Sequence, residues 1–112
     1  MKNERVAIYL RYGKAAQNKK IDALDEVVKD FKNWELVHRY VDDGFSAMDK
    51  NRPALNNMIE DCRNGKADIV CINGVHQFSR DPLTVIRMFK LFKDYGVKVY
   101  DISLGKFVGL VG

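Results

Sequence analysis

Three arginines follow predicted strands, and their placement is typical of an anion-binding site. Arg11 ends an apolar segment, Arg52 follows the loop "DDGFSAMDKN", and Arg80 lies in "HQFSRDP". Loops after the carboxyl ends of neighbouring parallel strands converge on one crevice. A guanidinium group suits phosphate there, because its planar fork bonds two oxygens at once and stays charged. Spacing alone leaves a second interpretation open, in which each arginine snorkels or pairs with a nearby acid: Asp42, Asp43 or Asp81.

The elements that must position these arginines alternate between strand and helix along the chain. Apolar or alternating segments predict strands at 5–12, 35–43, 67–72 and 97–103. Apolar residues at helical spacing predict helices over 21–32, from Pro53 to the stop at Gly65, and from Pro82 to Gly96. The core is expected to include several side chains of the last two helices, namely Met58, Met88, Phe89 and Phe92.

This alternation predicts an α/β fold with three layers, in which helices cover both faces of a mostly parallel central sheet. The chain has 112 residues, 46% of them hydrophobic, which is enough for one domain with a real core. We therefore expect a single domain over residues 1–112.

Composition narrows the function only slightly. A net charge of +4 is a mild bias toward polyanions that many proteins share. No segment approaches the roughly 20 apolar residues of a membrane span, and no signal peptide is visible. Cys62 and Cys71 lack metal-ligand spacing, and neither His38 nor His76 has a neighbouring ligand cluster. We expect a cytoplasmic protein with reduced thiols, no metal and no cofactor.

Three stretches carry a family resemblance: "YLRYGKAAQ", "YVDDGFSAMDKNRPALNNMIEDCRNGKADIV" and "FSRDPLTVIRMFKLFKDYGVKV". In order and spacing they resemble the catalytic domain of the serine recombinases, the resolvase and invertase family that includes large phage integrases. The resemblance implies site-specific DNA recombination. In that family a serine attacks the DNA phosphate, forms a phosphoseryl link and releases a 3′-hydroxyl without a metal, and strand exchange follows within a tetramer.

The same resemblance implies a damaged active site. Arg11, Arg52 and Arg80 match family positions, with Gln17, Asp43 and Ser46 in supporting places. Gly13 stands where the family has its nucleophilic serine, and glycine has no side chain that could attack. His76-Gln77 replaces an Asp-Arg pair, so that a phosphate-binding arginine is lost at Gln77. We therefore predict a pseudoenzyme that is impaired in cleavage.

Other interpretations stay open beside this one. Gly13 could be an engineered or sporadic replacement in an otherwise active recombinase, although that would not explain His76 and Gln77. Cleavage could survive through another nucleophile. The chain could instead be an interaction module that modulates an intact recombinase. A flavodoxin-like ligand binder is disfavoured, because "YGKAAQNKK" has a single glycine and forms no glycine-rich phosphate loop.

The end of the sequence bears on the partners. "SLGKFVGLVG" is glycine-rich and lacks helical periodicity, whereas the family continues into an oligomerisation helix and a DNA-binding region. We expect this chain by itself to bind DNA weakly and without sequence preference. Association as a homodimer, or with an intact serine recombinase, is the other expected contact.

Overall fold

The structure, a computed structural model, describes residues 3–12, 21–44 and 52–109. Its described part contains one five-stranded sheet in the order β2-β1-β3-β4-β5. The strands are β1 (Glu4–Tyr12), β2 (Trp34–Asp43), β3 (Ile69–Ile72), β4 (Lys98–Asp101) and β5 (Lys106–Val108). β1 to β4 run parallel, and β5 pairs antiparallel with β4. The predicted mostly parallel sheet is confirmed.

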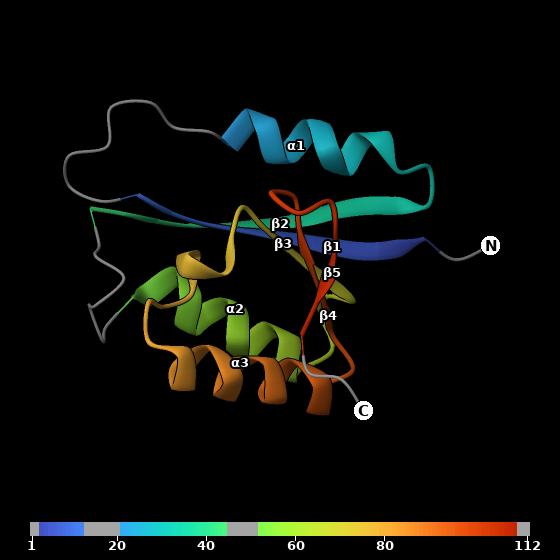
Figure 1. The fold of residues 1–112 in the computed structure, drawn as a ribbon. Helices are drawn as coiled ribbons and strands as arrows, with labels where there is room; N and C mark the ends of the chain where they lie inside the picture. Colours follow the sequence, from blue (N-terminus) through green and yellow to red (C-terminus); the bar gives the residue numbers. More distant parts are fainter. Residues whose placement is uncertain (1–2, 13–20, 45–51, 110–112) are drawn as a thin grey trace.

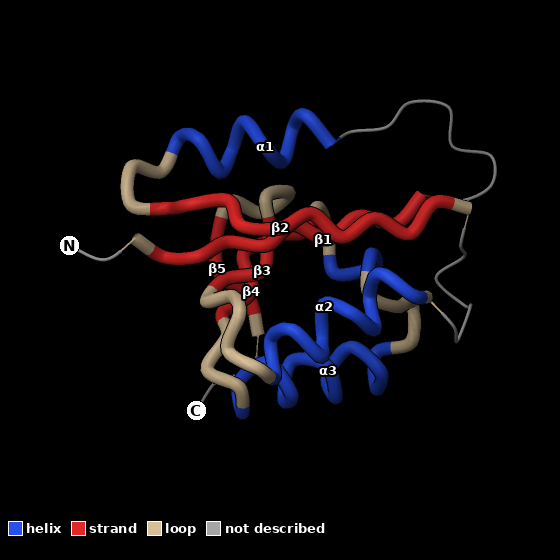
Figure 2. The backbone as a smooth tube through the Cα atoms, turned by 180° about the vertical axis from the view of Figure 1, so that it is seen from behind, coloured by secondary structure: helices blue, strands red, loops and turns tan. Residues whose placement is uncertain are grey.

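Helices cover both faces of this sheet, as the alternating pattern predicts. α1 (Ile21–Asp30) lies on one face, while α2 (Pro53–Arg63) and α3 (Pro82–Asp94) lie side by side on the other (Figure 1). The view from behind shows the same three layers (Figure 2). No helix in the described part of the chain is long and apolar enough to span a membrane.

β1 is the strand on which the two halves of the core meet. Val6, Ile8 and Leu10 belong to the cluster that includes Leu24 and Val28 of α1. The alternate residues Ala7 and Tyr9 belong to the cluster on the other face, with buried residues of α2 and α3. A strand buried on both faces reads as a continuous apolar run, as this one does. The carboxyl end of β1 is consequently held in place from both sides.

Two local features differ from the sequence prediction. The last predicted strand ends early, at Asp101, and the chain then turns at Gly105 (φ +65°) to form β5. Three residues are too few to show a period, so only pairing with β4 reveals β5 as a strand. The segment between β3 and α3 contains a turn of 3₁₀ helix, η1 (Val75–Gln77), where the sequence suggested only a loop.

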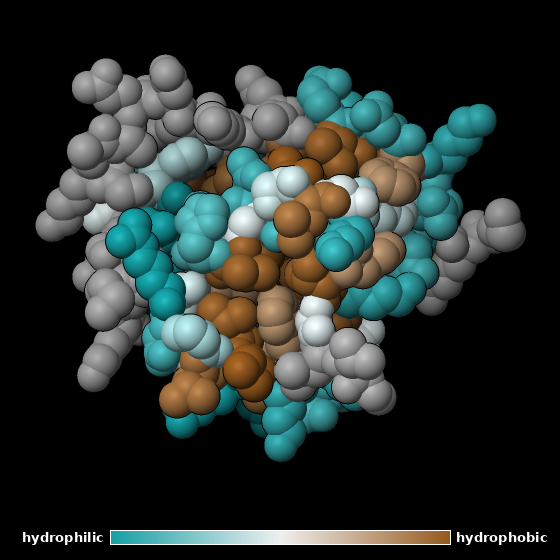
Figure 3. All heavy atoms as spheres, viewed as in Figure 1, coloured by the Kyte–Doolittle hydropathy of each residue, from teal (hydrophilic) through white to brown (hydrophobic). Residues whose placement is uncertain are grey.

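Aromatic rings tie β5 to the rest of the sheet. Phe31 stacks on Trp34 with ring centroids 3.9 Å apart, and Tyr100 meets Trp34 edge-on at 5.2 Å. Phe107 of β5 meets Tyr100 edge-on at 5.2 Å and is half exposed. On the face seen in Figure 3, which has the same view as Figure 1, apolar side chains gather over the middle and hydrophilic ones surround them. The aromatic cluster therefore joins the α1–β2 turn to β4 and β5.

Burial governs the chemistry of the two cysteines. Cys62 in α2 and Cys71 in β3 are free and buried, and burial raises the pKa of each thiol to about 12. A thiol reacts as its thiolate, which is scarce well below the pKa. We predict that the native protein at about pH 8 resists a thiol reagent, whereas denatured protein reacts at both cysteines, as mass spectrometry after alkylation would show. Rapid labelling of either cysteine in the native state would contradict the packing of α2 or β3.

Candidate active site

A buried carboxylate joins the carboxyl ends of β1 and β2 to the start of α2. Asp42, at the end of β2, is only 2% exposed. It accepts a hydrogen bond from the Tyr9 hydroxyl at 2.8 Å, and from the backbone N–H groups of Ala54 and Leu55 at 2.8 and 3.0 Å. The first N–H groups of a helix have no partner within the helix and attract negative charge. Asp42 therefore fixes where α2 begins.

Arg52, which immediately precedes α2, is drawn into the same buried network. It is 4% exposed, and its Nη1 donates to the backbone carbonyl of Gln77 at 2.7 Å and to the Tyr9 hydroxyl at 3.4 Å. Within the described residues its Nε has no hydrogen-bond partner. Burial, reinforced by the hydrogen bond to Asp42, raises the pKa of Tyr9, so the hydroxyl stays neutral. Arg52 thus bridges β1 and η1 from the start of α2.

Gln77 closes the connection back to β1. Its side-chain Oε1 accepts a hydrogen bond from the backbone N–H of Arg11 at 2.7 Å. Because its backbone carbonyl also accepts from Arg52, Gln77 uses both of its carbonyl oxygens to hold the end of β1 against α2. The structure therefore brings three predicted site residues together: Arg11, Arg52 and Gln77.

An open hollow of about 370 Å³ lies over this junction. Its lining includes Arg11 and Tyr12 from β1, His76 and Gln77 from η1, and Ser103 after β4. Next to it lies a more apolar hollow of about 460 Å³, whose lining includes Arg80. His76 lines both hollows. Arg11 and Arg80 thus border neighbouring hollows that share the His76 side chain.

The remaining predicted site residues fall elsewhere. Asp43 is exposed at the end of β2, in register with Tyr12. Gly13, Gln17 and Ser46 lie outside the described residues.

Asp81, offered as a possible partner for an arginine, instead caps α3. It accepts from the Leu83 N–H at 3.3 Å and from the Thr84 hydroxyl at 2.7 Å. The Thr84 hydrogen bond is the main cause that lowers the pKa of Asp81.

Sequence reasoning missed two buried acids. The sequence suggests Asp42 only as a partner for an arginine, yet strand alternation places it on the same face as the buried Tyr40, and this alternation is visible in the sequence. Asp101, at the end of β4, accepts from the backbone N–H groups of Gly74 and Ser103 at 3.0 and 2.9 Å, and from the Ser103 hydroxyl at 2.6 Å. Asp101 thus anchors the segment that carries η1, a role that no local sequence pattern indicates.

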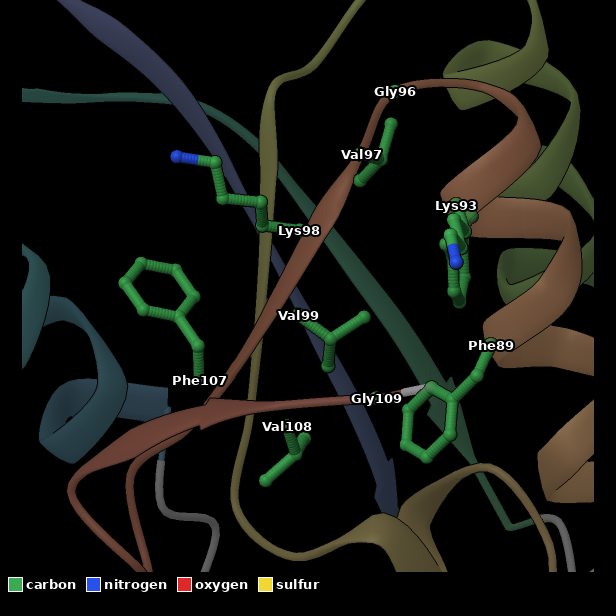
Figure 4. A pocket seen from close by; sticks show the side chains of 10 residues that line it. Phe89, Lys93, Gly96, Val97, Lys98, Val99, Phe107, Val108 and Gly109 are labelled. Atoms are coloured by element: carbon green, nitrogen blue, oxygen red, sulfur yellow. The ribbon is translucent and has the colours of Figure 1, made fainter. Parts of the chain in front are cut away.

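A further hollow lies apart from this site. A hollow of about 320 Å³ between α3 and the β4–β5 edge is lined mainly by apolar side chains, with Lys93 and Lys98 beside them (Figure 4). It contains none of the predicted site residues that the structure describes. Across residues 3–12, 21–44 and 52–109, no group of three or more His, Cys, Asp or Glu side chains is arranged to hold a metal ion.

Comparison with known proteins agrees with the geometry. The family model described as "Resolvase, N terminal domain" matches residues 6–107. The chain belongs to this family. No curated protein sequence matches the resolvase domain described here.

Solved structures show the same fold. The resolvase domain is similar to a resolvase family site-specific recombinase from Streptococcus pneumoniae, with a TM-score of 0.76 and 26% identity over 94% of this chain and 76% of that one. It also resembles the N-terminal catalytic domain of TP901-1 integrase, with a TM-score of 0.76 and 23% identity over 91% of this chain and 79% of that one. The C-terminal catalytic domain of ISC1926 TnpA, an IS607-like serine recombinase, gives a TM-score of 0.74 and 20% identity over 88% and 67% of the two chains. The matches establish a serine recombinase catalytic domain fold.

The two neighbouring acids of β2 offer a matched test of the buried network. We predict that Asp42→Ala lowers the free energy of unfolding by about 2 to 4 kcal/mol, because it leaves the Tyr9 hydroxyl and two N–H groups of α2 without their acceptor. Asp43→Ala, at an exposed position, should change it by less than about 0.5 kcal/mol. Urea unfolding followed by circular dichroism measures both. Equal losses in the two variants would contradict the role of Asp42.

Proposed function

We propose that this chain is a serine recombinase catalytic domain that keeps a phosphate-binding frame but is impaired in DNA cleavage. The observation that carries the proposal is the bonding of Gln77. Its neutral side chain accepts from the Arg11 N–H at 2.7 Å, while its carbonyl accepts from buried Arg52. A residue that the resemblance aligns with a phosphate-binding arginine here serves to hold the site together.

The loss of the nucleophile rests on the sequence. Gly13 is the second residue after Arg11 and takes the place of the family's serine. Covalent attack needs an oxygen close to the phosphorus and in line with the leaving group, and a glycine offers none. Lys14 differs too much in length and chemistry to take over, and Ser46 matches a different family residue in a supporting loop.

The loss of positive charge at position 77 compounds the defect. A glutamine amide forms a weaker hydrogen bond to a phosphate oxygen than a guanidinium does and brings no charge. Removing one preorganised electrostatic donor typically slows a reaction on the order of a hundred- to a thousand-fold. Cleavage is therefore impaired at two separate steps, attack on the phosphorus and stabilisation of the developing charge.

The proposed substrate class is duplex DNA, and the proposed mode is weak, sequence-independent binding by a single cytoplasmic domain over residues 1–112. Two similar structures are a site-specific recombinase and an integrase catalytic domain, which supports DNA as the ligand. Arg11 and Arg80, which line the hollows, provide the phosphate contacts, with Gln17, Asp43 and Ser46 in supporting places. Buried Arg52 holds the frame through its bonds to Gln77 and Tyr9. Self-association, or association with an intact serine recombinase, belongs to the same proposal.

A suicide substrate tests the loss of cleavage. We predict that the unmodified chain forms no covalent adduct with a nicked duplex whose cleaved product cannot be resealed, as read on a denaturing gel. Gly13→Ser should stay poor, because the charge at position 77 is still missing. Gly13→Ser with Gln77→Arg should form more adduct, by roughly a hundredfold or less, since the arginine also gives up the bond to Arg11.

Lys14→Ser is the matched control, because it adds a hydroxyl one residue away and should form no adduct. A strong band from the unmodified chain would overturn the proposal and direct attention to Ser46 or Ser79. A strong band from Gly13→Ser alone would show that Gln77 is an adequate replacement and that only the nucleophile is lost. The proposed defect at position 77 would then be wrong.

A further inference from the structure

The backbone around His76 leaves a defined space for its ring. His76 is exposed, and it lines both the hollow beside Arg11 and the hollow beside Arg80. Its ring lies over the backbone of Gly74, where a Cβ would be 2.5 Å from Cε1 and 2.6 Å from Nδ1 of the imidazole. Only a residue without a side chain leaves this space. Gly74 also has φ +95°, a conformation that glycine adopts readily.

Asp101 fixes the backbone beneath the ring. Its carboxylate accepts the Gly74 N–H at 3.0 Å and is shared with the backbone and hydroxyl of Ser103. The imidazole is therefore seated on a segment that is anchored to the end of β4. An exposed side chain held in this way has a preferred place beside the two arginines.

The charges around His76 favour an anion. Of the described residues that line the two hollows, none is an acid. Among the described residues that line these hollows with His76, the other titratable or charged ones are Arg11 and Tyr12 from β1, and Arg80 from the segment before α3. Two acids belong to the adjoining segments: Asp81, which follows Arg80 and caps α3, and Asp101, which is buried and accepts from N–H and hydroxyl donors. A proton on the imidazole would thus add a positive charge to the two hollows that Arg11 and Arg80 line.

We propose that His76 is a pH-dependent anion-binding residue, which joins Arg11 and Arg80 in holding a phosphate-class oxyanion when its imidazole is protonated. The proposal rests on the proposed function, because it concerns the same phosphate site. It assigns part of the positive charge missing at Gln77 to the neighbouring residue when that residue is protonated.

The contact between His76 and Gln77 shows how protonation changes the site. His76 Nε2 lies 3.5 Å from the side-chain nitrogen of Gln77. A neutral imidazole can accept from that amide at Nε2, whereas a protonated one carries hydrogen on both ring nitrogens and can only donate. Protonation therefore ends the contact with Gln77 and makes the Nε2 hydrogen available to an anion in the hollow.

The direction of the pH dependence follows from these roles. Histidine is the side chain whose charge ordinarily changes between about pH 5 and 8, whereas arginine stays protonated throughout. Anion affinity should therefore rise as the pH falls through this range. Sulfate is the suitable probe, because its own charge stays constant over the same range.

The test is a sulfate titration of the full chain followed by NMR of the histidine ring signals, at about pH 5.5 and about pH 8. We expect sulfate to shift the His76 signals and to bind roughly three- to tenfold more tightly at the lower pH, which is the scale of one partly exposed charge-assisted hydrogen bond. His76→Gln should abolish most of this difference while leaving the thermal unfolding midpoint nearly unchanged.

His38 is the matched control. It is the other histidine of the chain, it is exposed on β2 with its ring centroid 4.2 Å from that of Tyr40, and its hollow contains Glu60 and Asp61. Its signals should respond little to sulfate, and His38→Gln should keep the pH dependence of the unmodified chain.

Equal affinity at both pH values, no binding at either, or a pH dependence that survives in His76→Gln would each overturn the proposal. The covalent-adduct assay is independent of these outcomes. Adduct formation by the unmodified chain would refute the proposed impairment and leave the His76 result standing, whereas a pH-independent sulfate site would refute the role of His76 alone.

Discussion

The arrangement of the site depends on one buried carboxylate, that of Asp42. A buried charge is costly unless it is fully hydrogen-bonded, and Asp42 meets this condition with a hydroxyl from β1 and two N–H groups from α2. Those partners come from different layers of the fold. The interaction therefore fixes the position of the sheet edge relative to α2, and with it the guanidinium of Arg52 just before the helix. From Arg52 the chain of contacts continues through Gln77 to the end of β1.

This network explains how the arrangement that binds phosphate can be kept in a chain that has lost DNA cleavage. Its members hold the carboxyl ends of the strands together, so losing one would cost stability whether or not DNA is cut. Gln77 illustrates the point, because both of its carbonyl oxygens accept hydrogen bonds within the network. Position 13 follows β1 in the sequence and lies outside the described residues. In the proposed function, glycine at that position removes the nucleophile, because it has no side-chain oxygen.

The sequence predicts the architecture well, because buried positions appear as regularly spaced or continuous apolar residues. The continuous apolar run of β1 and the stripes of α2 and α3 identify these elements and their order. Patterns fail where long-range pairing decides the structure. β5 exists because Lys106–Val108 pairs with β4, and η1 is held by an acid 27 residues away. The pattern also did not distinguish Asp42 from Asp43 as the residue that positions the site, because that difference lies in hydrogen bonds to α2.

In the proposed function, the arginines beside the two hollows still bind DNA phosphate in a chain that does not cleave. The most direct measurement is fluorescence anisotropy of labelled, unrelated duplexes over a range of salt concentrations. It compares Arg11→Gln/Arg80→Gln with Lys29→Gln/Lys90→Gln, which removes the same charge from exposed positions on α1 and α3. We predict weak binding that does not depend on sequence and falls steeply with salt, and a loss of affinity several-fold larger in the arginine pair than in the lysine pair. Equal losses in the two variants, or nanomolar discrimination between sequences at physiological salt, would contradict it.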